Sequence, residues 1–281
     1  MFLLYKILET HYKKNLIVAY FNHHTREQCQ QEEDYLIDLW KKEGIQVEIW
    51  ECDFEKIKKL YPSKSFEELA REKRYQFFDA LCHIHNAKKI FLAHHLDDRI
   101  ETMMFHMLRG TKLTWLINMQ EISWNIFRPL LGIEKKDILN YLEEYSLPYF
   151  EDESNAKNEH TRNFIRNQIT PLFEKVHPEN KKNLSHLLEY FEDMKEYIDE
   201  NVALFLWNTH DFLLKDFLLQ SPFFQKEILR KIYFERNNRS TIGLSEANIS
   251  EVLRFLNEKN GKWIKEIHGL KLKKEKGIIY F

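Results

Sequence analysis

The sequence predicts an α/β fold in which a doubly wound parallel sheet is followed by a second, mostly helical domain that ends in a small β-sheet. In the first half, short apolar runs alternate with segments of helical periodicity, as they do in parallel sheets. After Pro171, helical segments follow one another without strands, and the tail returns to short strands. The expected domains are therefore residues 1–176 and 177–281.

The elements of the first domain have local signals. The expected strands are residues 16–21, 45–50 and 89–93. Helical periodicity covers residues 27–42 and 65–85, and residues 1–8 are expected to form part of an amphipathic helix. Ser65 and Glu68 have the spacing of a capping box. A further helix should run from Asp97 to Arg109-Gly110, because apolar residues recur at three- and four-residue spacing.

The sequence of the second domain predicts a run of helices followed by short strands. Helices are predicted at residues 183–214, 223–234 and 245–256. Strands are predicted at residues 263–267, 270–274 and 278–281, with turns at His268-Gly269 and Lys276-Gly277. We therefore expect the chain to end in a β-hairpin structure.

Composition limits the classes of function. The 281 residues are 43% hydrophobic and 31% charged, which is typical of a globular protein. Lys and Arg number 42 against 44 Asp and Glu, so any RNA site must be a local basic patch. Cys29, Cys52 and Cys82 form no C-x-x-C pair, which favours a reducing cytoplasm. No apolar run reaches the roughly 18 residues that span a bilayer, so no membrane partner is expected.

Two segments contain candidate ligand-binding residues. Asn22 and His23 follow the first predicted strand, at the edge where open α/β sheets bind ligands. The alternative is an ordinary polar loop. Arg71 and Arg74 share one face of the capped helix, and the guanidinium fork suits phosphate. The alternative is a solvated charged face paired with neighbouring glutamates.

The most specific segment is residues 93–102, where a strand leads into a helix. His94 and His95 are followed by three carboxylates, of Asp97, Asp98 and Glu101. A helix dipole stabilises acidic residues in the first turn by about 0.3–1 kcal/mol, which is the structural alternative. Grouped carboxylates also suit Mg²⁺, and a histidine beside them can move a proton or hold a phosphate.

A fourth segment contains Arg162 and Arg166, which are four residues apart on one helical face. It follows an acidic stretch at residues 151–153, so simple surface salt bridges are the alternative.

Together these segments resemble the tRNA(Ile)-lysidine synthases, members of the pyrophosphate-loop ATPase superfamily. The matching motifs are N-H-H-x-R at residues 22–26, A-R-x-x-R-Y at 70–75, A-H-H-x-D-D-x-x-E-T at 93–102, R-P-L-L at 128–131, D-x-S-N at 152–155 and R-N-x-x-R at 162–166. The resemblance runs from about residue 1 to residue 180 and extends less specifically into the helical domain.

The resemblance implies a cytoplasmic ligase that uses ATP and Mg²⁺. ATP adenylates the C2 oxygen of the wobble cytidine in tRNA(Ile) with a CAU anticodon, and the amine of L-lysine then displaces AMP to give lysidine. The implied catalytic residues are Arg74, His94, Asp98 and Arg166. The implied nucleotide-binding residues are Asn22, His23, Arg71, His95 and Arg162. Mg²⁺ is expected on Asp98 and Glu101.

The sequence departs from the family in one respect, because it contains no S-G-G-x-D-S phosphate loop. Residues 1–4 resemble the run that directly follows that loop, so we expect the catalytic domain to be incomplete at its amino end and to bind ATP poorly. The missing part is about 20–40 residues, enough for the loop and the first strand. Losing that central strand should leave two neighbouring strands with unpaired edges and a gap in the core.

Three other interpretations remain open. The first is a tRNA thiolase of the same fold, although these enzymes usually carry a C-x-x-C pair. The second is a metal phosphohydrolase that uses His94, His95, Asp97 and Asp98, and it needs further ligands from other strands. The third is a tRNA-binding protein without catalytic activity, which the missing loop favours. The sequence gives no sign of the oligomeric state.

Overall fold

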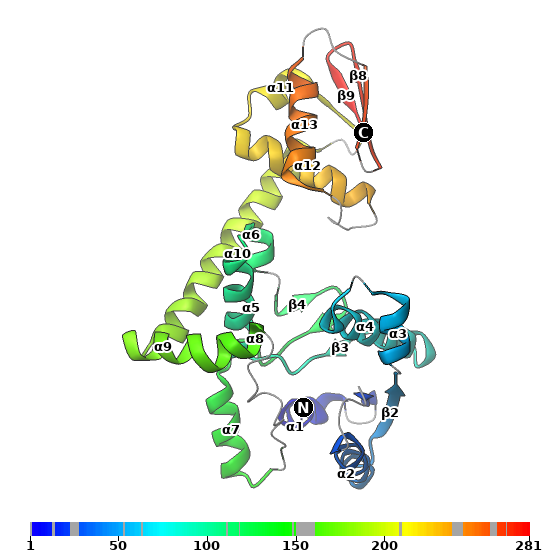
Figure 1. The fold of residues 1–281 in the computed structure, drawn as a ribbon, viewed down its shortest axis with the longest axis vertical. Helices are drawn as coiled ribbons and strands as arrows, with labels where there is room; N and C mark the ends of the chain where they lie inside the picture. Colours follow the sequence, from blue (N-terminus) through cyan, green and yellow to red (C-terminus); the bar gives the residue numbers. More distant parts are fainter. Residues whose placement is uncertain are drawn as a thin grey trace. The chain divides into compact units, whose positions relative to one another are not determined.

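The computed structural model divides the chain into two compact units, residues 1–185 and 186–281. It describes residues 2–12, 15–22, 28–52, 54–62, 64–110, 112–117, 119–147, 149, 161–207, 210–237, 244–258, 263–267 and 269–281. The division falls inside the long helix α10 (Asn180–Phe205), whereas the sequence suggested residue 176, where α9 (Thr170–Val176) ends. Figure 1 colours the first unit from blue to green and the second from yellow-green to red.

The first unit is a mixed α/β structure with parallel strand pairs, which confirms the predicted fold class. Its strands are β1 (Ile17–Asn22), β2 (Gln46–Glu51), β3 (Ile90–Phe91), β4 (Ile122–Ser123) and β5 (Ile126–Phe127). The β1 strand pairs in parallel with β2, and β3 pairs in parallel with β5. The short β4 strand runs antiparallel to β5. The first two predicted strands lie within one residue of β1 and β2, but the third is shorter than expected.

The strands of this unit form two separate pieces. Among the described residues, β1 pairs with β2 alone, and β3 pairs with β5 alone. A cavity of about 930 Å³ lies between them, lined by β1 residues such as Val18 and by Phe91 of β3. Well-packed protein interiors contain few voids larger than a water molecule.

The predicted capping box of the fourth helix is present. In α4 (Phe66–Ile84), the Glu68 backbone N–H donates to Ser65 Oγ over 3.2 Å, and the Ser65 N–H donates to Glu68 Oε2 over 2.8 Å. The helix buries Leu69 and Phe77 against Phe21 of β1. These contacts position one face of α4 next to the sheet.

The other helices of the first unit cover the sheet pieces. They are α1 (Phe2–Tyr12), α2 (Gln28–Lys42), α3 (Phe54–Leu60), α5 (Leu96–Leu108), α6 (Leu113–Leu116), α7 (Lys135–Glu144), α8 (Thr161–Phe164) and the π-helical turn η3 (Ile165–Ile169). The expected amphipathic helix at the start is confirmed, because α1 buries Leu4 and Leu8 with Leu130 and Leu142. The apolar stripe of α5 is also buried, with Ile100 and Met104 nearly inaccessible.

The second unit packs helices against one face of a small antiparallel sheet. Its elements after α10 are β6 (Asp211–Leu213), α11 (Leu214–Leu218), α12 (Pro222–Arg236), α13 (Glu246–Asn257), β7 (Ile264–Ile267), β8 (Leu270–Glu275) and β9 (Ile278–Tyr280). The strand order is β6-β9-β8-β7. Gly269 and Gly277 have φ of +85° and +80° in the two turns, a conformation that glycine adopts without strain.

One prediction in this unit was wrong. The helix expected to reach residue 214 ends at Phe205, and Asp211–Leu213 form strand β6 instead. This strand pairs with β9 at the end of the chain, and Phe212 is buried in the core. The pairing partner lies far away in the sequence, so local periodicity did not reveal it.

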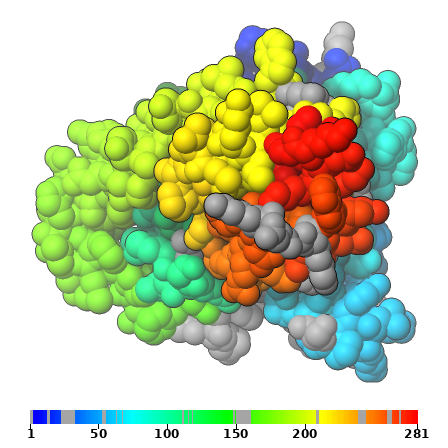
Figure 2. All heavy atoms as spheres, turned by 90° about the horizontal axis from the view of Figure 1, so that it is seen from above, coloured from blue at the N-terminus to red at the C-terminus, as the bar shows by residue number. Residues whose placement is uncertain are grey.

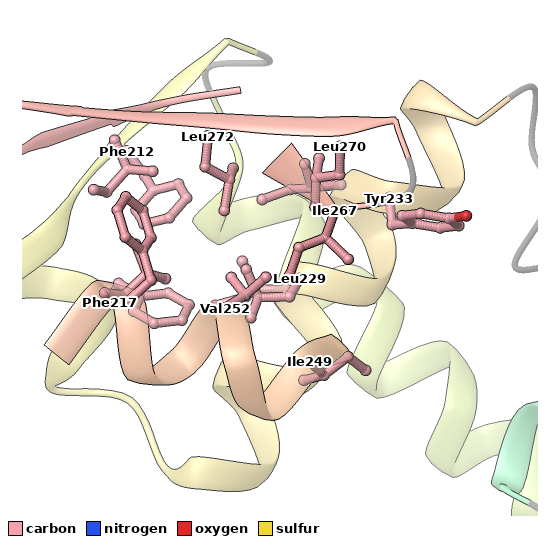
Figure 3. Packing of buried hydrophobic residues seen from close by; sticks show 14 of the residues in the cluster. Phe212, Phe217, Leu229, Tyr233, Ile249, Val252, Ile267, Leu270 and Leu272 are labelled. Atoms are coloured by element: carbon pink, nitrogen blue, oxygen red, sulfur yellow. The ribbon is translucent and has the colours of Figure 1, made fainter. Parts of the chain in front are cut away.

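The core of the second unit lies between the sheet and the helices. Figure 3 shows Leu270 and Leu272 of β8 on the sheet side, above Leu229 of α12 and Val252 of α13. In the space-filling view, the red atoms of the closing strands lie beside the orange atoms of α13 (Figure 2). Within the described part of the chain, no helix is both long and apolar enough to cross a membrane.

The burial of Ile232 in α12 gives a test of this core. Ile232 is fully buried, whereas Leu219 is 82% exposed. We expect Ile232→Ala to lower the free energy of unfolding by about 2–5 kcal/mol, because it leaves a cavity. The control Leu219→Ala should change it by less than about 0.5 kcal/mol. Urea unfolding of both variants measures the difference, and equal effects would contradict the packing.

Candidate functional site

The candidate site lies where β3 leads into α5. His95 is the N-cap residue of α5, and its backbone N–H donates to Asp98 Oδ2 over 3.1 Å. The His95 ring adds a contact, with Nε2 3.3 Å from the same oxygen. Because free amides and the helix dipole favour negative charge in a first turn, this position holds the Asp98 carboxylate in place. The sequence predicted both residues here.

Arg166 binds the acidic turn from a distant segment. Its Nε and Nη2 donate to the two carboxylate oxygens of Glu101 over 2.6 and 2.7 Å. Its Nη2 also lies 3.4 Å from Asp98 Oδ1. Burial raises the pKa of Glu101, and the hydrogen bond from Arg166 opposes that rise. The same hydrogen bond raises the pKa of Arg166.

The segment that carries Arg166 is a π-helical turn, η3, between α8 and α9. Pro171 follows it, and a proline inside an α-helix clashes with the carbonyl four residues earlier. The wider turn is closed instead by Thr170, whose backbone N–H and hydroxyl both donate to the Ile165 carbonyl. Arg162, one turn earlier, lies over the Phe105 ring of α5 at 5.5 Å. Both predicted arginines therefore contact α5.

Asp97 serves a different set of contacts. Its Oδ2 accepts from the Lys135 backbone N–H over 2.7 Å, and its Oδ1 lies 2.9 Å from Lys181 Nζ. Burial alone would raise the pKa of Asp97, but these two partners hold it below the ordinary value. Lys181 also lies 3.1 Å from Glu174. Asp97 thus ties α5 to the starts of α7 and α10.

A basic group surrounds His94 on the other side of Asp98. Arg128 Nε donates to His94 Nδ1 over 3.2 Å, and Arg128 Nη1 donates to the Gln120 carbonyl over 2.8 Å. Burial, opposed by the charge of Asp98 and aided by the charges of Arg128, Arg71 and Arg74, lowers the pKa of His94 to about 4. The ring is therefore neutral at pH 7. Since Nδ1 accepts, its proton lies on Nε2.

The two arginines of α4 differ in their surroundings. Arg71 is exposed and lies over the Tyr75 ring at 5.0 Å. Arg74 is half-buried, and burial lowers its pKa. A guanidinium that has lost water gains most from an anionic ligand. The charges of both arginines act on the His94 ring, and a basic group of this kind is suited to phosphate.

Arg128 is a site residue that the sequence did not single out. The sequence placed it only in the R-P-L-L stretch at residues 128–131. It follows β5, the neighbour of β3, and is only 5% exposed. Its contact with His94 depends on strand pairing, and the one available signal was a charged residue after an apolar strand.

The first predicted segment is placed only in part. Asn22 ends β1 and is buried, and its Nδ2 donates to Glu33 Oε2 of α2 over 2.6 Å. This contact ties β1 to the helix that follows it. His23 lies outside the described residues, as does the acidic stretch that precedes Arg162.

The contacts of Asp98 and Glu101 decide which of these carboxylates could bind a metal ion. In the described ranges, no group of three or more His, Cys, Asp and Glu side chains is placed to hold a metal ion. Both oxygens of Glu101 are bound by Arg166, so Glu101 fits a metal only if Arg166 moves. Asp98 has a longer contact with Arg166 and fits better as a single ligand. Mg²⁺ commonly takes one or two carboxylates and completes its shell with phosphate and water.

The first unit has the α/β fold of a pyrophosphate-loop domain. The solved U34-tRNA thiolase NcsA from Methanococcus maripaludis has the same fold, with a TM-score of 0.54 over 68% of this chain and 67% of that chain, at 20% identity. The profile of the PP-loop domain family matches residues 1–173. The chain therefore belongs to the PP-loop domain family.

Within this family, the chain is similar to several tRNA(Ile)-lysidine synthases. The enzyme of Staphylococcus aureus strain MRSA252 is 33% identical over 220 residues, covering 76% of this chain and 49% of the relative. That of Bacteroides thetaiotaomicron is 30% identical over 250 residues, covering 87% and 56%. These matches confirm the resemblance of the motifs. The chain spans about half the length of the curated relatives it matches.

The His94–Arg128 contact predicts a titration. Arg128→Gln removes a charge that depresses the pKa of His94, so that pKa should rise from about 4 toward the ordinary 6.5. Because the folded-state pKa lies below the ordinary value, the stabilisation from neutral His94 is complete above pH 6.5 and is lost as pH falls toward 4. In Arg128→Gln less stability should be lost as pH falls, because the pKa of His94 then lies closer to its ordinary value. NMR titration of the histidine rings measures the pKa directly.

Arg109→Gln is the matched control for that titration. The Arg109 charge contributes to the lowered pKa of His106, not to the principal causes for His94. It should therefore move the His106 titration and leave His94 in place. An unchanged pKa of His94 in Arg128→Gln would contradict the assigned contact.

The Arg166–Glu101 pair predicts a stability coupling. Arg166→Met leaves the Glu101 carboxylate buried without its partner and should destabilise the fold by roughly 2–4 kcal/mol, less than for a fully buried pair. Arg166 is 29% exposed, which moderates the effect. Adding Glu101→Gln should recover part of the loss. A double-mutant cycle by urea unfolding measures the coupling, and Arg162→Met serves as control. Additive effects of the two substitutions would rule out the pair as a clamp.

Proposed function

We propose that this chain forms the catalytic part of a tRNA(Ile)-lysidine synthase. Its reaction would join L-lysine to C2 of the wobble cytidine in tRNA(Ile) with a CAU anticodon, through an adenylated intermediate made from ATP. The PP-loop domain family and the names of the relatives support this reaction class. The observation that carries the proposal is the basic group of Arg71, Arg74, Arg128 and neutral His94 beside Asp98.

The basic group suits the phosphates of ATP. Arg74 is desolvated, and charge-assisted hydrogen bonds to phosphate are stronger where water is excluded. Arg71 adds an exposed donor fork at the rim. Two positive charges on one helical face would thus attract the negatively charged phosphates of a nucleotide.

His94 would act as a hydrogen-bond donor. Its Nδ1 is engaged by Arg128, so only Nε2–H is available to a ligand. A neutral imidazole with a pKa near 4 does not accept a proton readily at pH 7. It is suited to stabilising negative charge that develops on a phosphate oxygen.

Asp98 is the residue that would hold Mg²⁺, which when bound neutralises charge on the leaving pyrophosphate. Arg166 and His95 position its carboxylate from two sides. Arg166 would therefore act partly by orienting Asp98, because its best hydrogen bonds go to Glu101. Arg162 and Asn22 would contribute at the edge of the nucleotide site.

The experiment below distinguishes two alternatives. The first is a tRNA-binding protein without catalysis. A tRNA thiolase is favoured by the shared fold with NcsA. The cysteines argue against the thiolase, because Cys52 and Cys82 lie in different places. Cys52 packs in the core with Leu69, whereas Cys82 lines the cavity between the sheet pieces.

A fusion experiment tests the proposal. The chain is joined behind the loop-bearing first segment of the Staphylococcus aureus relative, and AMP release is measured. We expect release only with ATP, Mg²⁺, lysine and tRNA(Ile) together, and lysidine in the nucleosides of the digested tRNA. In this protein, Asp98→Asn should nearly abolish release with little change in Tm, because Asn is acceptable near a helix start but lacks the charge.

Two further variants complete the test. Arg166→Ala should slow release, whereas Arg254→Ala, an exposed position on α13, should affect it much less. Near-normal lysidine formation by Asp98→Asn would rule out the metal role of Asp98. Tight tRNA binding without AMP release by the fused protein would favour the non-catalytic alternative, and sulfur incorporation would favour the thiolase.

A further inference from the structure

The long helix α10 has more apolar surface than its own core covers (Figure 1). One face of this helix packs into the core of the second unit through Ile198, Val202 and Leu206. A helix that faces one core needs an apolar stripe of roughly 100°. A second stripe of apolar residues lies beside that face, and its members are 39–72% exposed. They are Leu187, Tyr190, Met194, Tyr197 and Leu204.

The exposed stripe has the spacing of a coiled-coil seam. Its members are alternately three and four residues apart, and Asn201 completes the series between Tyr197 and Leu204. This is the a/d pattern of a heptad, and it extends over about 26 Å at 1.5 Å per residue. A single asparagine at an a position can fix the register of paired helices. The stripe therefore has the pattern that binds one further helix.

The charges along α10 indicate which kind of helix would bind. Residues 187–204 contain six acidic side chains and one lysine, Lys195, which pairs with Asp199. Asp193 and Glu200 occupy the g positions beside the stripe, and both are exposed and form no ion pair with any residue that the structure describes. Charges at the e and g positions determine partner choice in coiled coils. Basic residues opposite these two carboxylates would be attracted, whereas acidic ones would be repelled.

The same charges argue against other occupants of the stripe. RNA and anionic membranes attract basic surfaces, whereas this side of α10 is acidic. In an antiparallel pair, a second copy of the chain would bring its own Asp193 and Glu200 against those of the first. In a parallel pair, g positions face e positions, and the e residue Ile198 packs in the core of its own unit. A basic helix of a different protein meets neither obstacle.

We propose that the exposed stripe of α10 is a docking site for a basic amphipathic helix of a partner protein. The partner presents apolar residues such as leucine and isoleucine at its a and d positions, and lysine or arginine opposite Asp193 and Glu200. Short helices are only marginally stable alone in water, so such a segment would form its helix on binding. The site lies on residues 187–204, within the second unit. This inference does not depend on the proposed reaction.

Synthetic peptides test the site on the intact chain. The probe is a fluorescein-labelled peptide of three heptads with leucine or isoleucine at a and d, one asparagine at an a position, and lysine at e and g. The control peptide has the same composition, but its apolar residues are redistributed so that they form no stripe. Fluorescence anisotropy measures the Kd, and circular dichroism measures helix content on mixing. The probe should bind at least about tenfold more tightly than the control and gain helix.

Three variants of the chain locate the binding. Tyr197→Asp places a charge within the stripe and should weaken probe binding by about tenfold or more, because an unpaired charge is costly in an apolar contact. Leu219→Asp makes the same kind of change at an exposed position outside α10 and should leave the Kd within about twofold. Glu200→Lys should weaken binding of the lysine probe and strengthen binding of a probe with glutamate at e and g. The Tm of each variant shows that it folds.

Four outcomes would overturn the proposal. Equal binding of probe and control would show only a general attraction of positive charge to α10. No binding of the probe at about 1 mM would show that the stripe does not accept a helix. Probe binding that Tyr197→Asp leaves unchanged would place the contact elsewhere. Concentration-dependent dimerisation of the chain in gel filtration, abolished by Tyr197→Asp, would assign the stripe to a second copy.

Discussion

The bidentate ion pair between Arg166 and Glu101 is the contact on which the candidate site depends. It joins η3 to α5 across 65 residues of sequence and reaches Asp98 with the same guanidinium. A buried carboxylate without such a partner is strongly destabilising, so the two segments are held together. Asp98 lies in the first turn of α5 and Glu101 in the next, and this one cation contacts both carboxylates.

The site is divided into an acidic side and a basic side at the start of α5. The acidic side consists of Asp98 and Glu101, with Arg166 as their cation. The basic side has His94 at its centre, kept neutral by burial and by surrounding arginines. His94 is a neutral hydrogen-bond donor and Arg74 is a half-buried cation, so both have already lost much of their water before a ligand binds. This division is the one that the proposed binding of ATP and Mg²⁺ calls for.

Local signals in the sequence predicted most of the long helices and the strands β1, β2, β7, β8 and β9, because capping and apolar spacing act over a few residues. The Ser65–Glu68 box and the stripe from Ile100 were confirmed for this reason. Contacts that depend on strand order were missed, namely the pairing of β6 with β9 and the approach of Arg128 to His94. The clustering of His94, Asp98, Arg74 and Arg166 in one domain was anticipated only through the motifs. Their distribution between two sides of the site follows from tertiary packing.

The π-turn at η3 places one more residue in a helical run than regular α-helical hydrogen bonding would take up. Each residue of an α-helix rotates the chain by about 100°. The wider turn takes up its extra residue locally, because the Thr170 N–H reaches back five residues to the Ile165 carbonyl instead of four. The residues on either side of η3 are therefore spared the rotation that an added residue would impose on a regular helix. The chain accommodates an odd residue count between Arg162 and α9 in this way while both arginines keep facing α5.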